Sequence, residues 1–354
     1  MRRHFLPFFL AALLLPLSLL AQRPAAAPPA PAAAAQQAAS GERAEFQALQ
    51  KTSDDVLWRL ELGDVASVDK VWIPSDAPIR MRNPTAQGAG NPLLFHAYTF
   101  IPKSLGADQK APLLVYVHEG VHGNMDTSQA HIVRELIGLG YVIVAPEYRG
   151  STGYGAGFEN QIDYGGAEVV DVHSARDWAV ANLAHVDPAR VAIIGWSHGG
   201  YQALLNIFRY PKDYICAYAG VPVSDLVMRM GYKSQGYRDI YYGFLGKTAD
   251  EDPMEYRRRS PYFHAAELQT PLLIHTNTND EDVNVMEVEH LIDALKAAGK
   301  QSLFQYKIYQ DAPGGHYFNR IDTKFARSSR EEMYAFIGKY LHPAAAPTTG
   351  PTKP

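Results

Sequence analysis

Short apolar runs alternate with stretches of helical spacing along most of the chain. The runs at 113–117 and 191–194 carry no charged residue, a pattern typical of strands that are buried on both faces of a sheet. Between them, apolar residues recur at helical spacing over 167–183, which predicts a helix. The same criteria predict strands at 94–101, 141–145, 214–219, 272–275 and 304–308, and helices at 128–139, 197–210, 285–298 and 323–341. This alternation predicts an α/β fold, with a mostly parallel central sheet and helices on both of its faces.

The alternation stops between residues 225 and 262, where tyrosine and phenylalanine residues are mixed with charged ones. We expect this segment to be an excursion over the carboxyl edge of the sheet, where α/β proteins bind their ligands. Its aromatic side chains would then form part of a pocket wall. The alternative is a surface insertion whose aromatic side chains only pack against one another.

The N-terminal segment has the features of an export signal. Residues 1–4 are positively charged, and the apolar stretch that follows contains two prolines and is short for a membrane span. We therefore predict a signal peptide over 1–21 and a periplasmic or secreted protein without stable membrane insertion; retention as an uncleaved anchor is the alternative. The Ala/Pro-rich residues 22–41 predict a flexible linker, and residues 342–354 a disordered tail.

The composition narrows the class of partner. The 354 residues include 33 Lys and Arg against 37 Asp and Glu, a formal net charge of −4, so no basic field points to a nucleic-acid partner. Three consecutive arginines at 257–259 are more typical of a solvated helix face than of a phosphate site. The single cysteine, Cys216, lies in an apolar run, so we expect a buried thiol and no internal disulfide.

The pattern Gly195-x-Ser197-x-Gly199 lies between a predicted buried strand and a predicted helix. A sharp strand-to-helix turn at this point pushes the serine hydroxyl above the sheet, and glycines on either side avoid clashes with the neighbouring strand and helix. The helix N-terminus behind the serine also presents backbone N–H groups to developing negative charge. This context predicts that Ser197 is a nucleophile.

A nucleophilic serine needs a general base, and the base needs a carboxylate that orients it. In this arrangement the chain order is serine, acid, histidine, each on a loop after a strand. The last predicted strand runs into a loop that carries His316, which we predict to be the base. The preceding strand runs into Asp280, Glu281 and Asp282. Asp280 is favoured because it follows the strand soonest, whereas Asp282 could cap the next helix.

The sequence from His118 to His122 matches the zinc pattern H-E-x-x-H letter for letter. That chemistry requires both histidines one turn apart on a helix, whereas this motif follows a predicted strand and contains Gly120. We therefore assign no metal and no cofactor. The loop that carries His118 and Glu119 is better placed to supply one oxyanion donor, with the backbone N–H of His198 as the second.

Several motifs in the same order resemble the prolyl oligopeptidase family of serine peptidases. They are the sequence 195–201 around the serine, the turn 148–155, the helix start at 165–172, and the acid and histidine loops at 280–283 and 315–316. The resemblance covers residues 95–341 and implies the α/β-hydrolase fold. It also implies a triad of Ser197, Asp280 and His316.

The resemblance further implies an oxyanion region at His118, Glu119 and the N–H of His198, and a pocket wall that includes Val223 and Tyr241. One departure concerns Glu119, which stands where family members often have glycine. A carboxylate there would oppose an oxyanion unless it turns away or pairs, for example with a substrate amine.

A second departure concerns length. Residues 42–93 are too few for the β-propeller of the full-length family members, so we predict an N-terminal extension that packs on a hydrolase domain at 94–341. The resemblance then implies an exported serine peptidase that acts on a short peptide or an amide. A carboxylesterase with the same triad is the alternative, and a non-catalytic binding protein is a third. Oligomeric state has no signature in the sequence.

Overall fold

The computed structural model describes residues 30–342. The predicted signal peptide, most of the predicted linker and nearly all of the predicted tail lie outside these residues. Chain contacts divide the protein into two units, residues 1–41 and 42–354, and the sheet belongs to the second. In the part of the chain that the structure describes, no helix is long and apolar enough to cross a membrane.

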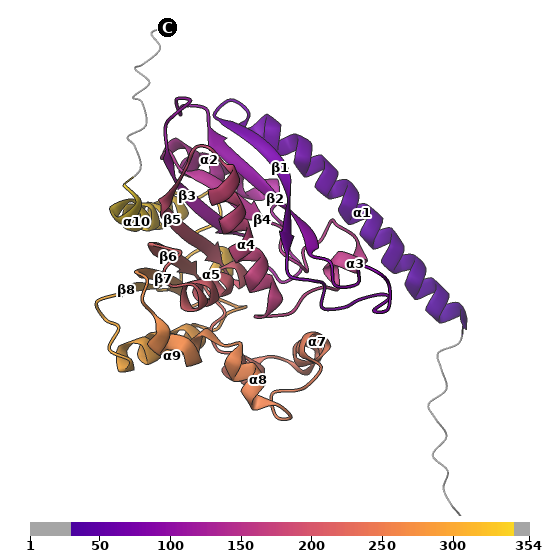
Figure 1. Ribbon diagram of the computed structural model, residues 1–354. Helices are drawn as coiled ribbons and strands as arrows, with labels where there is room; N and C mark the ends of the chain where they lie inside the picture. The colour runs from indigo at the N-terminus through magenta and orange to yellow at the C-terminus, as the bar shows by residue number, and fades with distance from the viewer. Residues whose placement is uncertain (1–29, 343–354) are drawn as a thin grey trace, which may run out of the picture. The chain divides into compact units, whose positions relative to one another are not determined.

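An eight-stranded sheet runs through the described part of the second unit (Figure 1). Its order is β1-β2-β4-β3-β5-β6-β7-β8, with β2 antiparallel to β1 and β4 and the remaining pairs parallel. The strands are β1 (Ala66–Ser75), β2 (Leu93–Pro102), β3 (Ala111–Val117), β4 (Val142–Pro146), β5 (Val186–Trp196), β6 (Cys216–Gly220), β7 (Leu272–Asn277) and β8 (Phe304–Tyr309). The predicted mostly parallel sheet is confirmed.

Helices cover both faces of the sheet, as predicted. One face packs against α4 (Ala167–Asn182), α5 (His198–Arg209) and α9 (Val285–Ala297). The other packs against α2 (Ala130–Gly138), α10 (Lys324–Leu341) and the C-terminal half of α1 (Ala30–Leu62). The central strands β3 and β4 are buried along their whole length, because the sheet is covered on both sides.

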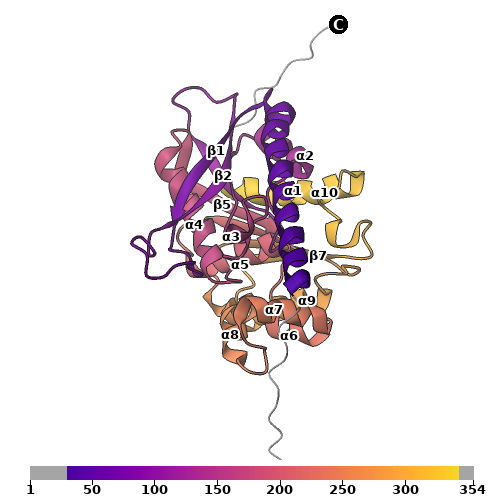
Figure 2. The same cartoon turned by 90° about the vertical axis from the view of Figure 1, so that its right-hand side faces the viewer.

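The segment from 225 to 262 is helical, with α6 (Leu226–Tyr232), α7 (Gln235–Leu245) and α8 (Pro253–Arg258), followed by the 3₁₀ turn η2 (Pro261–Glu267). These helices form a group of their own beside the two helix layers (Figure 2). The N-cap side chains Asp225, Ser234 and Asp252 accept hydrogen bonds from the first turns of α6, α7 and α8.

Two features of the N-terminal part were not predicted. Helix α1 already begins at Ala30, so residues 30–41 are helical where a flexible linker is expected; alanine, which dominates this stretch, has the strongest intrinsic helix propensity. Strand β1 lies at the edge of the sheet, and its burial follows no strict alternation. From α1 the side chains of Trp58 and Leu62 are fully buried, so this extension is part of the core.

Candidate active site

Ser197 occupies the turn between β5 and α5 in a strained conformation, with φ 54° and ψ −120°. Positive φ is unfavourable for a residue with a side chain and is held here by the surroundings, including a 2.9 Å bond from the Ser197 N–H to the carbonyl of Gly220. A Cβ on Gly195 would lie 2.4 Å from the backbone of Gly199, and one on Gly199 would lie 2.3 Å from the carbonyl oxygen of Val117. The close approach of backbones therefore explains both glycines of the motif.

His316 and Asp280 form a hydrogen-bonded pair at the carboxyl edge of the sheet. The imidazole Nδ1 lies 2.7 Å from Oδ2 and 2.9 Å from Oδ1 of the aspartate, whose side chain is fully buried. The same carboxylate accepts the backbone N–H groups of Asp282 and Val283, each at 2.8 Å. A carboxylate held in this way fixes the imidazole with Nδ1–H toward it and leaves Nε2 free for a proton from elsewhere.

The side chain of Asn277 joins the acid loop to the histidine loop. Its carbonyl oxygen accepts the N–H of Ala312 at 3.0 Å, and its amide donates to the carbonyl of Gly315 at 3.1 Å. Because β7 and β8 are parallel neighbours, both loops leave the same sheet edge, and Asn277 sets their spacing. The sequence alone did not predict this role of Asn277. The one feature that could have indicated it is a polar side chain at the end of a buried strand.

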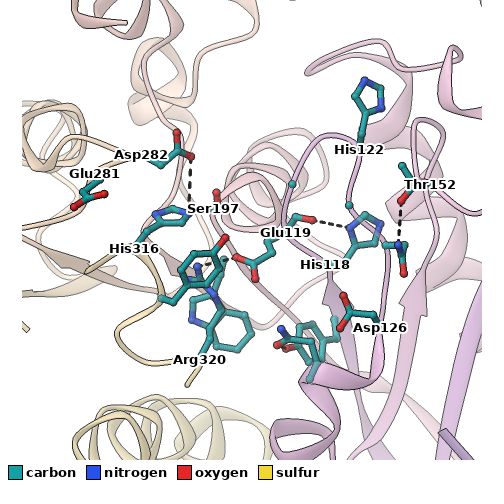
Figure 3. A pocket seen from close by; sticks show the side chains of 17 residues that line it. His118, Glu119, His122, Asp126, Thr152, Ser197, Glu281, Asp282, His316 and Arg320 are labelled. Atoms are coloured by element: carbon teal, nitrogen blue, oxygen red, sulfur yellow. Dashed lines mark hydrogen bonds and ion pairs between the residues drawn. The ribbon is translucent and has the colours of Figure 1, made fainter. Parts of the chain in front are cut away.

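The neighbouring acids have other partners. Asp282 lies 2.6 Å from Nζ of Lys233 and 3.2 Å from Arg229, and burial, which would raise the pKa of Asp282, is outweighed by these two cations, so its pKa is lowered. Its carboxylate is 3.9 Å from Nε2 of His316 (Figure 3). Asp282 does not cap α9, because Asn284 accepts the Met286 N–H at that helix start.

A cavity of about 650 Å³ opens over Ser197 and His316 (Figure 3). It is lined by Tyr116, His118, Glu119, Gly120, His122, Gly123, Asn124, Asp126, Gln129, Thr152, Trp196, Ser197, Glu281, Asp282, His316, Tyr317 and Arg320. Within the described residues, no hydrogen bond joins Ser197 to His316. In unliganded enzymes this contact is often loose and tightens only with substrate.

A family model described as the prolyl oligopeptidase family matches residues 127–344, more than half of the chain. The chain belongs to the prolyl oligopeptidase family. The matched region contains the Ser197 turn, the loops of Asp280 and His316, and the helices between them.

The chain is also similar in sequence to individual curated peptidases. The chain is 30% identical over 216 residues to the uncharacterized peptidase YuxL of Bacillus subtilis (strain 168), covering 59% of this chain and 32% of that protein. It is 28% identical over 223 residues to the acylamino-acid-releasing enzyme of Arabidopsis thaliana, covering 60% of this chain and 29% of that protein. The chain thus spans about a third of the length of these curated relatives.

Several solved structures share the fold of this chain. The acylaminoacyl peptidase of Pyrococcus horikoshii superposes with a TM-score of 0.65 at 19% identity, over 80% of this chain and 44% of that one. The puromycin-hydrolyzing peptidase of Mycobacterium tuberculosis superposes with a TM-score of 0.62 at 24% identity, over 79% of this chain and 40% of that one. At these identities the likeness concerns the fold alone, and it confirms the α/β-hydrolase fold.

The loop after β3 turns at Gly120, where φ is +75°, and is not helical, so its two histidines do not lie one turn apart on a helix. The His118 ring is buried, stacks on Tyr148 with centroids 4.2 Å apart, and lies 2.8 Å from the Ser151 hydroxyl through Nε2. Burial lowers the pKa of His118. His122 instead contacts the carbonyl of Gly150 at 2.8 Å. The His118 side chain therefore anchors the loop to Tyr148 and Ser151 in the protein interior.

Glu119 pairs across the cavity with Arg320, with Oε2 and Nη2 2.7 Å apart (Figure 3). The Arg320 side chain is 3% exposed, and its guanidinium lies over the Tyr317 ring at 4.7 Å. The sequence indicates that Glu119 needs a partner but does not predict Arg320. The position of Arg320, four residues after His316, is the one feature of the sequence that points to the site, and it is weak evidence.

A buried network ties α1 to the same loop. Nζ of Lys51, 3% exposed, lies 2.5 Å from Glu147 and donates to the carbonyl of Met125 at 2.5 Å and to Asn124 at 3.0 Å. Glu147 is 3.6 Å from Nε2 of His118 and accepts the Met125 N–H at 3.2 Å. The N-terminal extension thus supports one wall of the cavity, which the sequence did not reveal.

Val223 and Tyr241, which the resemblance implies for a pocket wall, are not among the residues that line this cavity. Both are buried in the core, with 2% and 1% exposure. Tyr241 packs against Tyr164 and Phe244, with ring centroids 4.8 and 5.8 Å away. Tyr241 thus packs among other aromatic rings, which favours the alternative of a packed insertion, whereas Tyr232 and Tyr242 of the same segment are exposed.

His198 follows Ser197 at the first position of α5, where the backbone N–H has no partner within the helix. Its ring is buried beneath the site, and burial, with His118, His122 and Arg229 adding to it, holds the pKa of His198 well below its usual range. The side chain is therefore a neutral core group, and only the backbone N–H is placed for the oxyanion role that we assign to it.

Proposed function

We propose that this protein is a serine hydrolase of the peptidase type, which forms an acyl-enzyme on Ser197. The observation that carries the proposal is the pair of His316 and the fully buried Asp280, 2.7 Å apart, in one cavity with the strained Ser197. Burial and two backbone N–H bonds hold the carboxylate in place, so the imidazole is oriented before substrate arrives.

In the proposed reaction, Nε2 of His316 takes the proton of the Ser197 hydroxyl as the oxygen attacks a substrate carbonyl. The backbone N–H groups of His198 and Glu119 donate to the resulting oxyanion. His316 then protonates the leaving amine, and the acyl-enzyme forms. Water attacks the acyl-enzyme by the same route, which releases the acid and restores Ser197.

The substrate that we propose is a short peptide or an amide. The relatives named above are peptidases, and a cavity of about 650 Å³ is large enough for a few residues. We also propose that the protein is exported, because residues 1–21 have the composition of a signal peptide. An ester is the alternative substrate, since the same three side chains cleave both bonds.

Labelling with a fluorophosphonate tests the proposal, because this reagent requires an activated serine and little else. We expect strong labelling of the wild-type protein and none of Ser197→Ala. A folded wild-type protein that stays unlabelled would contradict the proposal and favour a binding role. Hydrolysis of matched ester and anilide substrates then separates the two candidates: a peptidase cleaves both, whereas an esterase cleaves only the ester.

A further inference from the structure

Glu119 places a negative charge in the cavity where the proposed reaction develops another one. Its backbone N–H belongs to the loop that we assign to the oxyanion, and its carboxylate reaches into the cavity beside Ser197 (Figure 3). A fixed anion near a developing oxyanion raises the barrier, because the two negative charges repel each other. A working site with this residue therefore needs a compensating charge.

Arg320 has the geometry to supply that charge. Its guanidinium is almost fully buried, and Glu119 is its one ion-pair partner among the described residues, at 2.7 Å. None of its nitrogens has a well-aligned hydrogen-bond acceptor in residues 30–342. The remaining close contact is the face of Tyr317. The positive charge is thus not distributed over a network, as it is for Arg229 or Arg330, but is directed at Glu119.

The pair also connects two loops that must keep their distance. Glu119 comes from the loop after β3 and Arg320 from the loop after β8, four residues beyond His316. Two further contacts fix the position of Arg320: its carbonyl oxygen lies 3.0 Å from Nε2 of His131 on α2, and its N–H bonds to the carbonyl of Tyr317. A movement of Glu119 toward the oxyanion would have to break the ion pair.

We propose that Arg320 is a positioning residue that neutralises Glu119 and holds its carboxylate away from the oxyanion. This inference rests on the proposed function, since it assigns a role within the same reaction. It predicts that the two residues act as a unit: removal of the cation alone exposes the reaction to the Glu119 charge, whereas removal of both charges does not.

The rate of fluorophosphonate labelling measures this effect without knowledge of the substrate, because negative charge also develops on the phosphoryl oxygen. We expect Arg320→Met to slow labelling about 10- to 100-fold, less than the ~10²- to 10³-fold cost of losing one oxyanion donor, because both donors remain in place. Glu119→Gln should react faster than wild type, because it keeps the backbone N–H and leaves an uncompensated positive charge near the oxyanion. The double variant Glu119→Gln/Arg320→Met should recover to within about 3-fold of wild type, since both charges are gone.

Arg327→Met is the matched control, because it breaks an exposed ion pair with Asp322 on the same segment and should leave the rate unchanged. A double variant as slow as Arg320→Met would overturn the inference, as would a Glu119→Gln variant slowed tenfold. Glu119→Gln preserves the shape of the side chain, so this second outcome can be read even if Arg320→Met fails to fold. A wild-type protein without labelling would instead overturn the proposed function, and this inference with it.

Discussion

At the scale of single residues, two neighbouring aspartates show how environment decides role. Asp280 and Asp282 are two positions apart, yet only the first is enclosed and directed at Nδ1 of His316. Asp282 is 42% exposed and neutralised by Lys233 and Arg229. The choice of Asp280 from its place after the strand matches this geometry, because a short distance from the strand end keeps a side chain near the sheet edge.

Substitution of the two aspartates tests their roles. Asp280→Asn should lower the rate about 10³- to 10⁴-fold, because an amide no longer stabilises the imidazolium and favours the wrong tautomer. Asp282→Asn should change it less than about tenfold, since its contact with His316 is long and exposed. Turnover or labelling rates of both variants show which aspartate is the acid. Unfolding curves are the control for correct folding. The reverse order of effects would contradict the assignment of the acid.

Glu168 provides a prediction about pH. This fully buried carboxyl accepts the backbone N–H groups of Gly165 and Gly166, and burial raises its pKa from 4.5 to about 7. The folded state therefore binds a proton more tightly than the unfolded state, and stability contributed by this proton is complete below pH 4.5 and lost as pH rises toward 7. A shift of this size corresponds to about 3 kcal/mol.

Glu168→Gln removes that titration. Relative to wild type, the free energy of unfolding of the variant should improve by about 3 kcal/mol between pH 4.5 and pH 7.5. Urea unfolding at intervals of one pH unit measures the difference. A difference that stays constant across this range would mean that Glu168 titrates at an ordinary pKa.

At the scale of elements, the sequence predicts the strands that are buried on both faces and the edge strand β8, but misses β1 at the other edge. A doubly covered strand such as β3 must be apolar throughout, which is visible in the sequence. β1 is covered unevenly and carries charged and exposed residues, so its pattern has no clear period. The roles of Arg320 and Lys51 are not predictable from the sequence for another reason. Their partners come from distant segments of the chain, and no local pattern encodes such a contact.

The contact of α1 with the cavity wall can be tested at Lys51. Lys51→Met leaves Glu147 buried without its cation, which should destabilise the protein by about 3–5 kcal/mol. The double variant Lys51→Met/Glu147→Gln should recover part of this loss. Lys70→Met breaks the partly exposed ion pair between Lys70 of β1 and Asp55, which lies on α1 like Lys51. This variant should lower the free energy of unfolding by less than about 1 kcal/mol. Equal losses from Lys51→Met and Lys70→Met would show that the buried network has no special role.

At the scale of the whole molecule, the question is which part of the chain the hydrolase domain needs. The contacts place the boundary between the two units at Gly41 and Glu42, inside α1 rather than at its end. From the second half of this helix, Trp58 lies fully buried against Tyr98 and Phe100, with ring centroids 6.0 and 5.0 Å away. Beyond this boundary the first buried side chain of the helix is Lys51, and Trp58 and Leu62 follow it into the core.

Two truncations follow from this boundary. A protein that begins at residue 42 should unfold with the same free energy as one that begins at residue 22, because Lys51, Trp58 and Leu62, the buried side chains of α1, belong to the unit that begins at Glu42. A protein that begins at residue 63 loses Trp58, whose burial alone is worth about 3–5 kcal/mol, together with Leu62 and the Lys51 network. This loss approaches the whole stability of a typical domain, so we expect it not to fold. Circular dichroism and labelling of the truncated proteins measure both outcomes, and a labelled protein that begins at residue 63 would show that the hydrolase domain forms its cavity without α1.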